Sequence, residues 1–250
     1  MSIESALSDL TGPLPSGVAE GAALGAGVAD GYDLHKTVIG DVMVAFNTVG
    51  VSSVDLADGG FEERHRSRFG RSLIRAEAPS AWAGAIPAAL EAGTPGKLPI
   101  DLRAATPFQA EVLRATAAIP KGEVRPYAWL AAEVRRPKAA RAAGSAVAAN
   151  PIPLIIPCHR VVRSDGRLGG YSLGGPHHKR RLLESEEANP DWLEGLASRR
   201  VRVRGDASAG AFHHPTCRLI RRSAAFVDFG SVAEAREAGL KPCRACRPRE

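Results

Sequence analysis

The sequence predicts an α+β protein in which an α/β part, a helical part and a small cysteine-containing module follow one another. Three observations favour this fold class. Residues 35–57 carry β-branched runs, residues from Thr106 onward carry helical patterns, and three of the four cysteines lie near the C-terminus. The three patterns occupy separate stretches of the chain, which favours separate structural units.

The composition limits the class of protein. The chain has 250 residues, enough for one large domain or two to three small ones. Lys and Arg number 33 against 27 Asp and Glu, with a pI of about 9.4, which fits either a polyanionic partner or a solvated surface. The start, MSIESALSDL, lacks a secretory signal, and no window reaches the roughly 18 to 20 apolar residues of a membrane span. We therefore expect a cytoplasmic protein that does not enter a membrane.

The first hundred residues predict a flexible start and a small domain. Residues 1–30 include GVAEGAALGAGVADG, which favours a flexible segment or a weak helix. The stretch HKTVIGDVMVAFNTVGVSSVDLA (35–57) has the pattern of short antiparallel strands joined by turns. SAWAGAIPAALEAG (80–93) predicts one amphipathic helix ended by glycine. Residues 31–100 are therefore expected to form a small α/β domain.

Three helices are predicted next. TPFQAEVLRATAAI opens with Thr106 as N-cap and Pro at the first helical position. PYAWLAAEVRR (126–136) and PKAARAAGSAVAAN (137–150) are short helices with a tight junction, typical of a helix-turn-helix. The third helix is almost all small residues around Lys138 and Arg141. Either it packs closely against another helix, or it is slim enough to lie in a nucleic-acid groove with Arg141 projecting.

A single cysteine stands in NPIPLIIPCHRVV (150–162), where Cys158 precedes His159 and Arg160. A thiolate is a strong nucleophile, but a thiol with a pKa of about 8.5 is only slightly ionised at neutral pH. A neighbouring base and a positive charge both increase the thiolate fraction. The stretch therefore marks Cys158 as a candidate nucleophile, whereas a buried cysteine without such neighbours is usually inert packing.

The C-terminal module carries a second pattern, FHHPTCRLIRR…EAGLKPCRACRP. His213 and Cys217 are four positions apart, and Cys243 and Cys246 are three apart. A Cys-x-x-Cys pair with a second pair of ligands is typical of a structural zinc site. His214 is the alternative to His213, and a thioredoxin-like redox role lacks its strand-to-helix context. A strand and a helix ended by Gly239 are expected between the pairs, in a module too small to be stable without a staple.

Five blocks together carry a resemblance to a known family. IPCHRVV, GEVRPYAWLA, RPKAARAAG, NPIPLIIP and LGGYSLGG, in their order and spacing, resemble the O6-alkylguanine-DNA alkyltransferases (methylated-DNA–protein-cysteine methyltransferases) over residues 104–187. The resemblance implies an RNase H-like N-terminal domain and a DNA-binding, catalytic domain. The expected divisions of the chain are 1–30, 31–100, 101–190, a linker at 191–210 and a zinc-binding domain at 211–250.

The resemblance also implies an activity. Cys158 is expected to take the alkyl group from O6 of guanine, and from O4 of thymine, once per chain and without a cofactor. His159 draws the cysteine proton through a water, Glu186 orients His159, and Asn150 holds the turn around the active-site segment. The implied partner is double-stranded DNA and the implied state is a monomer. The alternative is a module that binds or senses the lesion without removing the alkyl group.

Base flipping gives roles to the remaining blocks, since a base inside a duplex must leave the stack to be reached. By resemblance, Arg141 fills the vacated space, and the slim helix, with Lys138, lies in the minor groove. Tyr127 pushes the phosphate backbone and contacts the base. Tyr171 and Ser172 line the pocket, and the carbonyls of Cys158 and Val161 accept from the exocyclic amine.

Residues 211–248 resemble the zinc-binding domain of Ada-type methyltransferases, with His213, Cys217, Cys243 and Cys246 as implied ligands. The Ada pattern has four cysteines, and the first of them accepts a methyl group from DNA phosphotriesters. His213 stands at that position, and a zinc-bound imidazole has no spare lone pair for a methyl group. We therefore expect a structural zinc and no phosphotriester repair.

Overall fold

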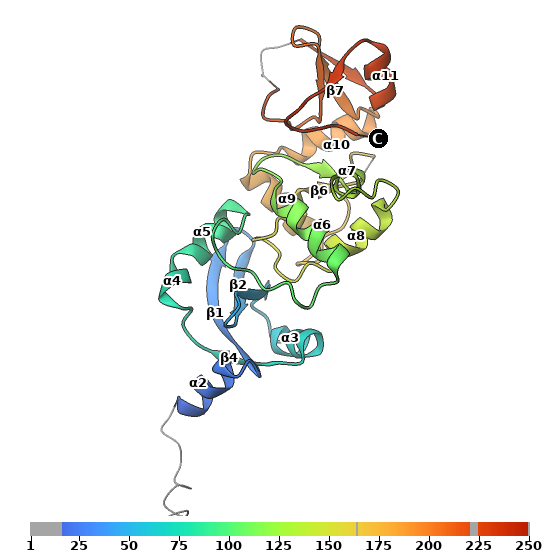
Figure 1. The fold of residues 1–250 in the computed structure, drawn as a ribbon. Helices are drawn as coiled ribbons and strands as arrows, with labels where there is room; N and C mark the ends of the chain where they lie inside the picture. The colour runs from blue at the N-terminus through green and yellow to red at the C-terminus, as the bar shows by residue number, and fades with distance from the viewer. Residues whose placement is uncertain (1–16, 164, 221–224, 250) are drawn as a thin grey trace, which may run out of the picture.

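The computed structural model describes residues 17–163, 165–220 and 225–249. Helices and strands are mixed along the chain, which confirms the mixed α and β class. Figure 1 shows three groups of elements, with the N-terminal sheet and the C-terminal sheet at opposite ends and a mainly helical group between them. Within the described residues, no helix is both long and apolar enough to cross a membrane.

The first group is built on a four-stranded sheet in the order β3-β2-β1-β4. β1 pairs antiparallel with β2 and parallel with β4, while β2 pairs antiparallel with β3. The elements are α2 (Val18–Gly25), β1 (Ala29–Thr37), β2 (Gly40–Phe46), β3 (Val51–Leu56), α3 (Phe61–Phe69), β4 (Ser72–Arg75), α4 (Ser80–Ala83) and α5 (Ala85–Ala92). The strands predicted at 35–57 are confirmed.

Two expectations for this group change. The single helix predicted at 80–93 is divided into α4 and α5 at Gly84. Pro87 has no N–H to bond the carbonyl of Ala83, so the proline does not support a continuous helix through this point. Within 1–30, α2 is a helix and β1 begins at Ala29; residues 1–16 lie outside the described part of the chain.

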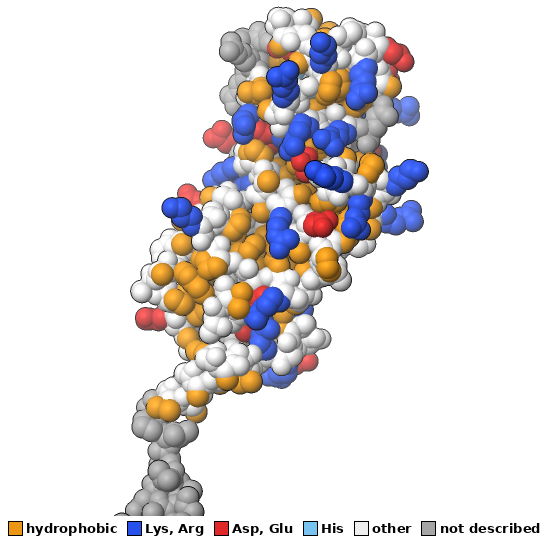
Figure 2. Space-filling model, in the orientation of Figure 1, with side chains coloured by type: hydrophobic (Ala, Val, Ile, Leu, Met, Phe, Trp, Pro, Cys, Tyr) orange, Lys and Arg blue, Asp and Glu red, His pale blue; other side chains and the backbone are white. Residues whose placement is uncertain are grey.

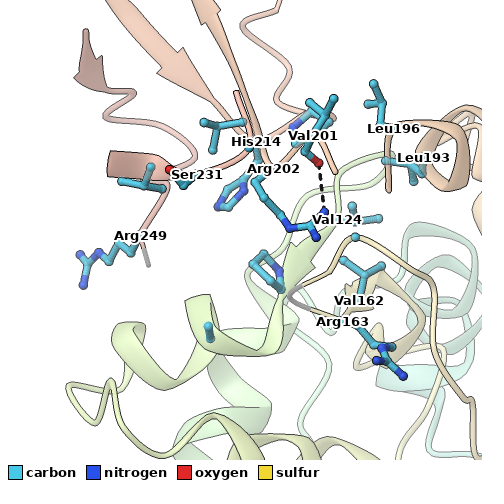
Figure 3. A pocket seen from close by; sticks show the side chains of 17 residues that line it. Val124, Val162, Arg163, Leu193, Leu196, Val201, Arg202, His214, Ser231 and Arg249 are labelled. Carbon is cyan, nitrogen blue, oxygen red and sulfur yellow. Dashed lines mark hydrogen bonds between the residues drawn. The ribbon is translucent and has the colours of Figure 1, made fainter. Parts of the chain in front are cut away.

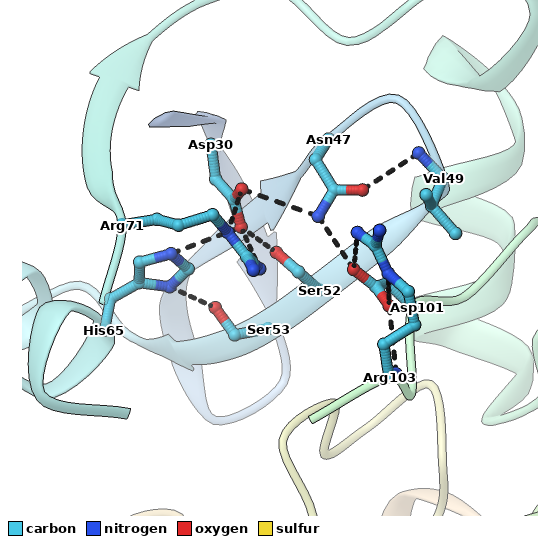
Figure 4. Close-up of polar contacts among 9 residues, drawn as sticks. All are labelled: Asp30, Asn47, Val49, Ser52, Ser53, His65, Arg71, Asp101 and Arg103. Carbon is cyan, nitrogen blue, oxygen red and sulfur yellow. Dashed lines mark hydrogen bonds and ion pairs between the residues drawn. The ribbon is translucent and has the colours of Figure 1, made fainter. Parts of the chain in front are cut away.

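A buried polar network holds the strands of this sheet to the loops around it (Figure 4). The carboxylate of Asp30 is fully buried and accepts from Arg71 Nε at 2.7 Å and from Ser52 Oγ at 2.6 Å. His65 Nε2 lies 3.2 Å from the same carboxylate. Burial alone would raise the pKa of Asp30, but these partners outweigh it and hold the pKa at about 2. The network therefore fixes a charged group that the sheet could not otherwise bury.

The second group is mainly helical. Its elements are α6 (Pro107–Ala117), β5 (Arg125–Pro126), α7 (Tyr127–Glu133), α8 (Ala140–Ala148), η1 (Cys158–Arg160), β6 (Val161–Val162), α9 (Pro176–Ser185) and α10 (Pro190–Ser198). Thr106 caps α6 as predicted, because its side chain accepts from the N–H of Gln109 and the Gln109 side chain accepts from the N–H of Thr106. β5 pairs parallel with β6, which directly follows η1.

The first two groups share one hydrophobic core. Val42 and Val44 of β2 belong to the same buried cluster as Ile152 and Ile155 of the segment before Cys158. The N–H of Val54 in β3 also donates to the carbonyl of Pro151 at 2.9 Å. The boundary expected near residue 100 is therefore a change of secondary structure and not a gap between cores.

The third group forms a four-stranded sheet in the order β10-β8-β7-β9. Its elements are β7 (Val203–Asp206), β8 (Ala211–His213), β9 (Phe226–Phe229), α11 (Val232–Glu237) and β10 (Lys241–Pro242). The strand and helix predicted between the two ligand pairs are confirmed as β9 and α11, and Gly239 follows with φ +80°. The range 191–210, expected as a linker, contains most of α10 and all of β7. This C-terminal module (residues 203–249) therefore begins earlier than residue 211.

Candidate functional site

Cys158 opens the short helical turn η1 at the end of a buried apolar segment, and only 4% of its surface is exposed. Asn150 shapes this segment from its start. Its side-chain Nδ2 donates to the carbonyl of Ile156 at 2.9 Å, and its Oδ1 accepts from the N–H of Ile152 at 3.0 Å. The two bonds span the chain between Asn150 and the cysteine, so the position of the thiol depends on this side chain.

His159, Glu186 and Arg160 form a buried array next to the thiol-bearing turn. His159 Nε2 lies 2.9 Å from Glu186 Oε1. Arg160 donates to the same carboxylate from Nε at 2.9 Å and from an Nη atom at 2.7 Å. Its guanidinium also donates to the carbonyls of Gly93, Ile119 and Ala92. The array joins η1 to the end of α9, although the two lie 27 positions apart in the chain.

The charges in this array set the protonation states. Burial alone would raise the pKa of Glu186, but hydrogen bonds from His159 and Arg160 outweigh it and hold the pKa at about 2. Burial lowers the pKa of His159, and Glu186 opposes that shift. The histidine is therefore neutral at physiological pH and available to take a proton. Its Nδ1 is buried and has no hydrogen-bond partner within the described residues.

The cation that acts on the thiol differs from the one expected. Burial raises the pKa of Cys158, while a hydrogen bond with Asn150 and the charge of Lys179 lower it. Arg160 faces Glu186 and backbone carbonyls instead. Lys179 is 1% exposed, and its Nζ donates to the carbonyls of Val161 and Leu168, both at 2.6 Å. Burial lowers the pKa of Lys179 to about 8, and Cys158 raises it.

The sequence motifs did not single out Lys179. It stands in the basic stretch HHKRRLLESEE, where three neighbouring cations carry no sign of which one is buried. A spacing signal was available, since Lys179 lies four and three positions before the buried Leu183 and Leu182 on one face of α9.

Two tyrosines lie close to the thiol. Burial raises the pKa of Tyr127, and the charge of Cys158 adds to the shift. Tyr171 is shifted further in the same direction, again by burial and by Cys158. The ring of Tyr171 meets that of His159 edge-on, with centroids 6.3 Å apart. The structure thus gathers Tyr127, Tyr171, His159 and Cys158 in one place.

Ser172 and the carbonyl groups of Cys158 and Val161 were expected to line the pocket for the base. Ser172 is exposed and lies in a groove of about 490 Å³, which Asn150 also lines. The carbonyl of Val161 faces Lys179, and the carbonyl of Cys158 accepts from the N–H of Val161. Both oxygens already have a donor, so only their second lone pairs are available to another partner.

Helix α8 presents a narrow exposed face. Ala143, Ala146 and Val147 are buried against the neighbouring helices, while Arg141 and the small residues Ala142, Ser145 and Ala148 are exposed. Lys138 is exposed just before the helix. One face of α8 packs closely, as the first sequence interpretation predicted, and the other is a slim exposed ridge. Figure 2 shows Lys and Arg side chains gathered over the helical group and the C-terminal module, with few Asp or Glu on this face.

The candidate metal ligands come together in the C-terminal module. One ligand atom from each of His213, Cys217, Cys243 and Cys246 lies within 4.8 Å of all the others, and the four residues are buried. His214 is buried outside this set, and its backbone N–H points to Cys246 Sγ at 3.3 Å. The donor set of three thiols and one imidazole is one that tetrahedral Zn²⁺ accepts. The geometry therefore favours His213 over His214.

Comparisons with known proteins show similarity to methylated-DNA–protein-cysteine methyltransferases. A family model described as "6-O-methylguanine DNA methyltransferase, DNA binding domain" matches residues 107–188. A methylated-DNA–protein-cysteine methyltransferase of Methanosarcina barkeri is 38% identical over 168 residues, covering 63% of this chain and 98% of the relative. The bifunctional transcriptional activator/DNA repair enzyme Ada of Escherichia coli is 49% identical over 98 residues, which are 39% of this chain and 27% of that protein.

A solved structure shows the same likeness in three dimensions. The Mycobacterium tuberculosis protein OGT, in a crystal structure in complex with DNA, superposes with a TM-score of 0.52 at 35% identity. The match covers 65% of this chain and 98% of that chain.

Proposed function

Because the chain belongs to the methylated-DNA–protein-cysteine methyltransferase family, we propose that it repairs DNA by moving the alkyl group of O6-alkylguanine to Cys158, once per chain. O4-alkylthymine is the second expected substrate. The observation that carries the proposal is the buried array of His159, Glu186 and Arg160 beside the thiol. The proposed setting is double-stranded DNA in the cytoplasm, with the protein acting as a monomer.

The thiol requires a base because burial raises its pKa. In the proposed mechanism, His159 accepts the Cys158 proton through a water at its free Nδ1, while Nε2 stays on the Glu186 carboxylate. The sulfur then attacks the alkyl carbon, an S–C bond forms, and the bond from that carbon to O6 breaks. The guanine keeps the electron pair and takes up one proton, which balances the proton released by the thiol. The resulting thioether gives water no activated carbon to attack, so the protein acts once.

Lys179 contributes to the same step. Its ammonium lowers the pKa of Cys158 and so favours the thiolate that His159 generates. Asn150 has two roles, because it both shapes the turn and lowers the pKa of the thiol. Arg160 acts indirectly, by holding the carboxylate that orients His159.

The DNA side of the proposal uses α7 and α8 as a helix-turn-helix, with the first group as the RNase H-like domain. The exposed small-residue face of α8 lies in the minor groove, with Lys138 on the backbone. Arg141 occupies the space that the flipped base leaves. Tyr127 contacts the rotating phosphate and the base, and Tyr171 and Ser172 line the pocket, where Cys158 and Val161 offer carbonyls.

His213, Cys217, Cys243 and Cys246 fit a structural zinc ion. Four protein donors close a tetrahedral site and leave no open position for a reacting group. When bound, the ion would cross-link β8 to the segment after β10. His213 stands where a methyl-accepting cysteine would be needed, so this site is not a second repair centre.

Cys158→Ala tests the proposal against lesion sensing without transfer. The variant should take up no alkyl group from a duplex carrying O6-methylguanine, and should bind that duplex nearly as tightly as the wild type. Wild-type protein that binds the lesion but leaves the methyl group on guanine would support the sensing alternative and contradict repair.

A further inference from the structure

The junction between the C-terminal module and the catalytic residues is held mainly by polar contacts. Apolar packing there is incomplete, because a cavity of about 280 Å³ opens on one side (Figure 3), lined by Val124, Val162, Leu193 and Val203 among others. A second cavity of about 410 Å³ lies on the other side, next to Trp129 and Arg247. The hydrogen bonds and ion pairs between these cavities therefore fix the position of the module.

Three of these polar contacts meet at residues 123–124, just before β5. Others reach α7, where Arg247 pairs with Glu133 and Arg249 donates to the carbonyl of Ala132. Thr216 Oγ1 accepts from the N–H of Val124 at 2.7 Å and lies 3.5 Å from the Val124 carbonyl. The N–H of Arg218 donates to Glu123 Oε1 at 3.2 Å. Glu123 is itself buried and pairs with the buried Arg125. Thr216 and Arg218 flank Cys217, so these three contacts come from the segment that carries one of the four candidate metal ligands.

The segment 122–124 also touches the catalytic array, at its other end. The N–H of Gly122 donates to Glu186 Oε2 at 3.3 Å. A side chain at Gly122 would not be accommodated, because φ is +76° and a Cβ atom would lie 2.9 Å from the Glu186 carbonyl oxygen. Gly122 therefore lets the backbone approach Glu186 closely enough to donate. A chain of contacts therefore runs from Thr216 through residues 122–124 to Glu186 and His159, and His159 directly follows Cys158 in η1.

We propose that Thr216 is a positioning residue for alkyl transfer, through which the C-terminal module holds residues 122–124 against the catalytic carboxylate Glu186. This inference rests on the proposed function and adds a role for the module in the chemical step itself. It predicts that the module affects the reactivity of Cys158 even toward a free base, where contacts with DNA play no part.

The test compares Thr216→Val, which keeps the side-chain shape and removes the hydroxyl, with Thr216→Ser, which restores the acceptor. Ser208→Ala is the matched control, since Ser208 is an exposed hydroxyl of the same module that bonds only Asp206. The substrate is free O6-benzylguanine, and the measured quantities are the rate constant at saturation and the half-saturating concentration. Melting temperature and metal content are recorded for every variant.

Thr216→Val should lower the saturating rate constant roughly two- to tenfold, the value of one hydrogen bond, with the half-saturating concentration unchanged. Thr216→Ser should recover most of the loss, Ser208→Ala should react as the wild type, and duplex substrate should show the same ratio as the free base. A wild-type rate for folded Thr216→Val on free base would overturn the proposal. A loss on duplex alone would also overturn it, since the module would then act through DNA.

Two further outcomes separate this inference from the proposed function. If the wild type takes no alkyl group from any substrate, the proposed function fails, and the coupling is read from the NMR resonances of the His159 ring. A shift of those resonances in Thr216→Val and not in Ser208→Ala would support the contact chain, and identical spectra would contradict it. If Thr216→Val does not fold, Thr216→Ala takes its place, with the same expected loss on the free base, and a wild-type rate for that folded variant would overturn the proposal.

Discussion

Glu186 Oε1 lies 2.9 Å from His159 Nε2 in a site from which water is largely excluded, and Arg160 holds the same carboxylate. This relationship fixes which histidine nitrogen is free, because Nε2 is committed to the carboxylate. The ionised Glu186 is paired with Arg160, so the buried charge of each depends on the other. The chemistry proposed for Cys158 and a large share of the local stability both follow from these contacts.

Replacement of the carboxylate tests that dependence. Glu186→Gln should slow alkyl transfer to Cys158 roughly tenfold or more, because His159 loses the partner that orients it and supports its charged form. The rate with free O6-benzylguanine measures the effect without DNA. A variant that stays folded and reacts at the wild-type rate would contradict the assigned role.

Glu186→Gln also tests how the free energy of unfolding depends on pH. The pKa of Glu186 is about 2 in the folded protein against an ordinary value of 4.5. A lowered carboxyl pKa stabilises the fold above the unfolded pKa, and this contribution, roughly 3 kcal/mol, fades as pH falls from about 4.5 toward 2. The difference in unfolding free energy between wild type and Glu186→Gln should therefore narrow over that range. A constant difference down to pH 3 would show that the ionised carboxylate is not its source.

Lys179 offers a second test of the thiol environment. Lys179→Met should slow transfer to Cys158, because the positive charge that lowers the thiol pKa is gone. It should also lower the free energy of unfolding by about 1–3 kcal/mol, since the carbonyls of Val161 and Leu168 lose their donor. Arg181→Met, at an exposed position of the same helix, is the control for loss of charge. Equal rates for the two variants would remove Lys179 from the mechanism.

Arg141 tests base flipping. Arg141→Ala should slow repair in duplex DNA by at least about tenfold, since the cost of unstacking a base is a few kcal/mol. Its reaction with free O6-benzylguanine should be unchanged, because Arg141 is exposed on α8 and away from the buried array. Equal losses on the two substrates would exclude the flipping role.

The zinc content of the purified protein tests the predicted metal site. Wild-type protein should contain about one zinc per chain, and Cys243→Ser/Cys246→Ser should contain none, because a tetrahedral site does not survive the loss of two thiolates. His214→Gln is the matched control and should keep the metal. Zinc retained by the double variant, or lost from His214→Gln, would refute the ligand set.

The sequence predicted the elements and residues that depend on local patterns or on motifs. Thr106 is an N-cap because its side chain accepts from the N–H three residues later, and the sequence TPFQ (106–109) is enough to predict this bond. The family resemblance also implied that Glu186 contacts His159, although the two residues lie 27 positions apart in the chain. What the motifs missed depends on packing between distant segments. Lys179 is buried, and Arg160 points away from the thiol, because both side chains donate to backbone carbonyls of distant segments.

The module boundary shows the same limit. VRVRGD (201–206) was expected to lie in the linker before the zinc-binding module. In the fold, β7 gains partners on both sides, β8 and β9, and Val203 packs on Phe212 and Val232. Only the presence of these later strands makes the stretch a central strand. The contact between Thr216 and Val124, 92 positions apart, is likewise a property of the fold alone.

Intact-protein mass spectrometry after incubation with a duplex carrying one O6-methylguanine tests alkyl transfer to Cys158 most directly. We expect a gain of one methyl group, saturating at one per chain and mapping to Cys158. A well-folded, reduced sample that gains no methyl group, or gains it at another residue, would contradict transfer to Cys158.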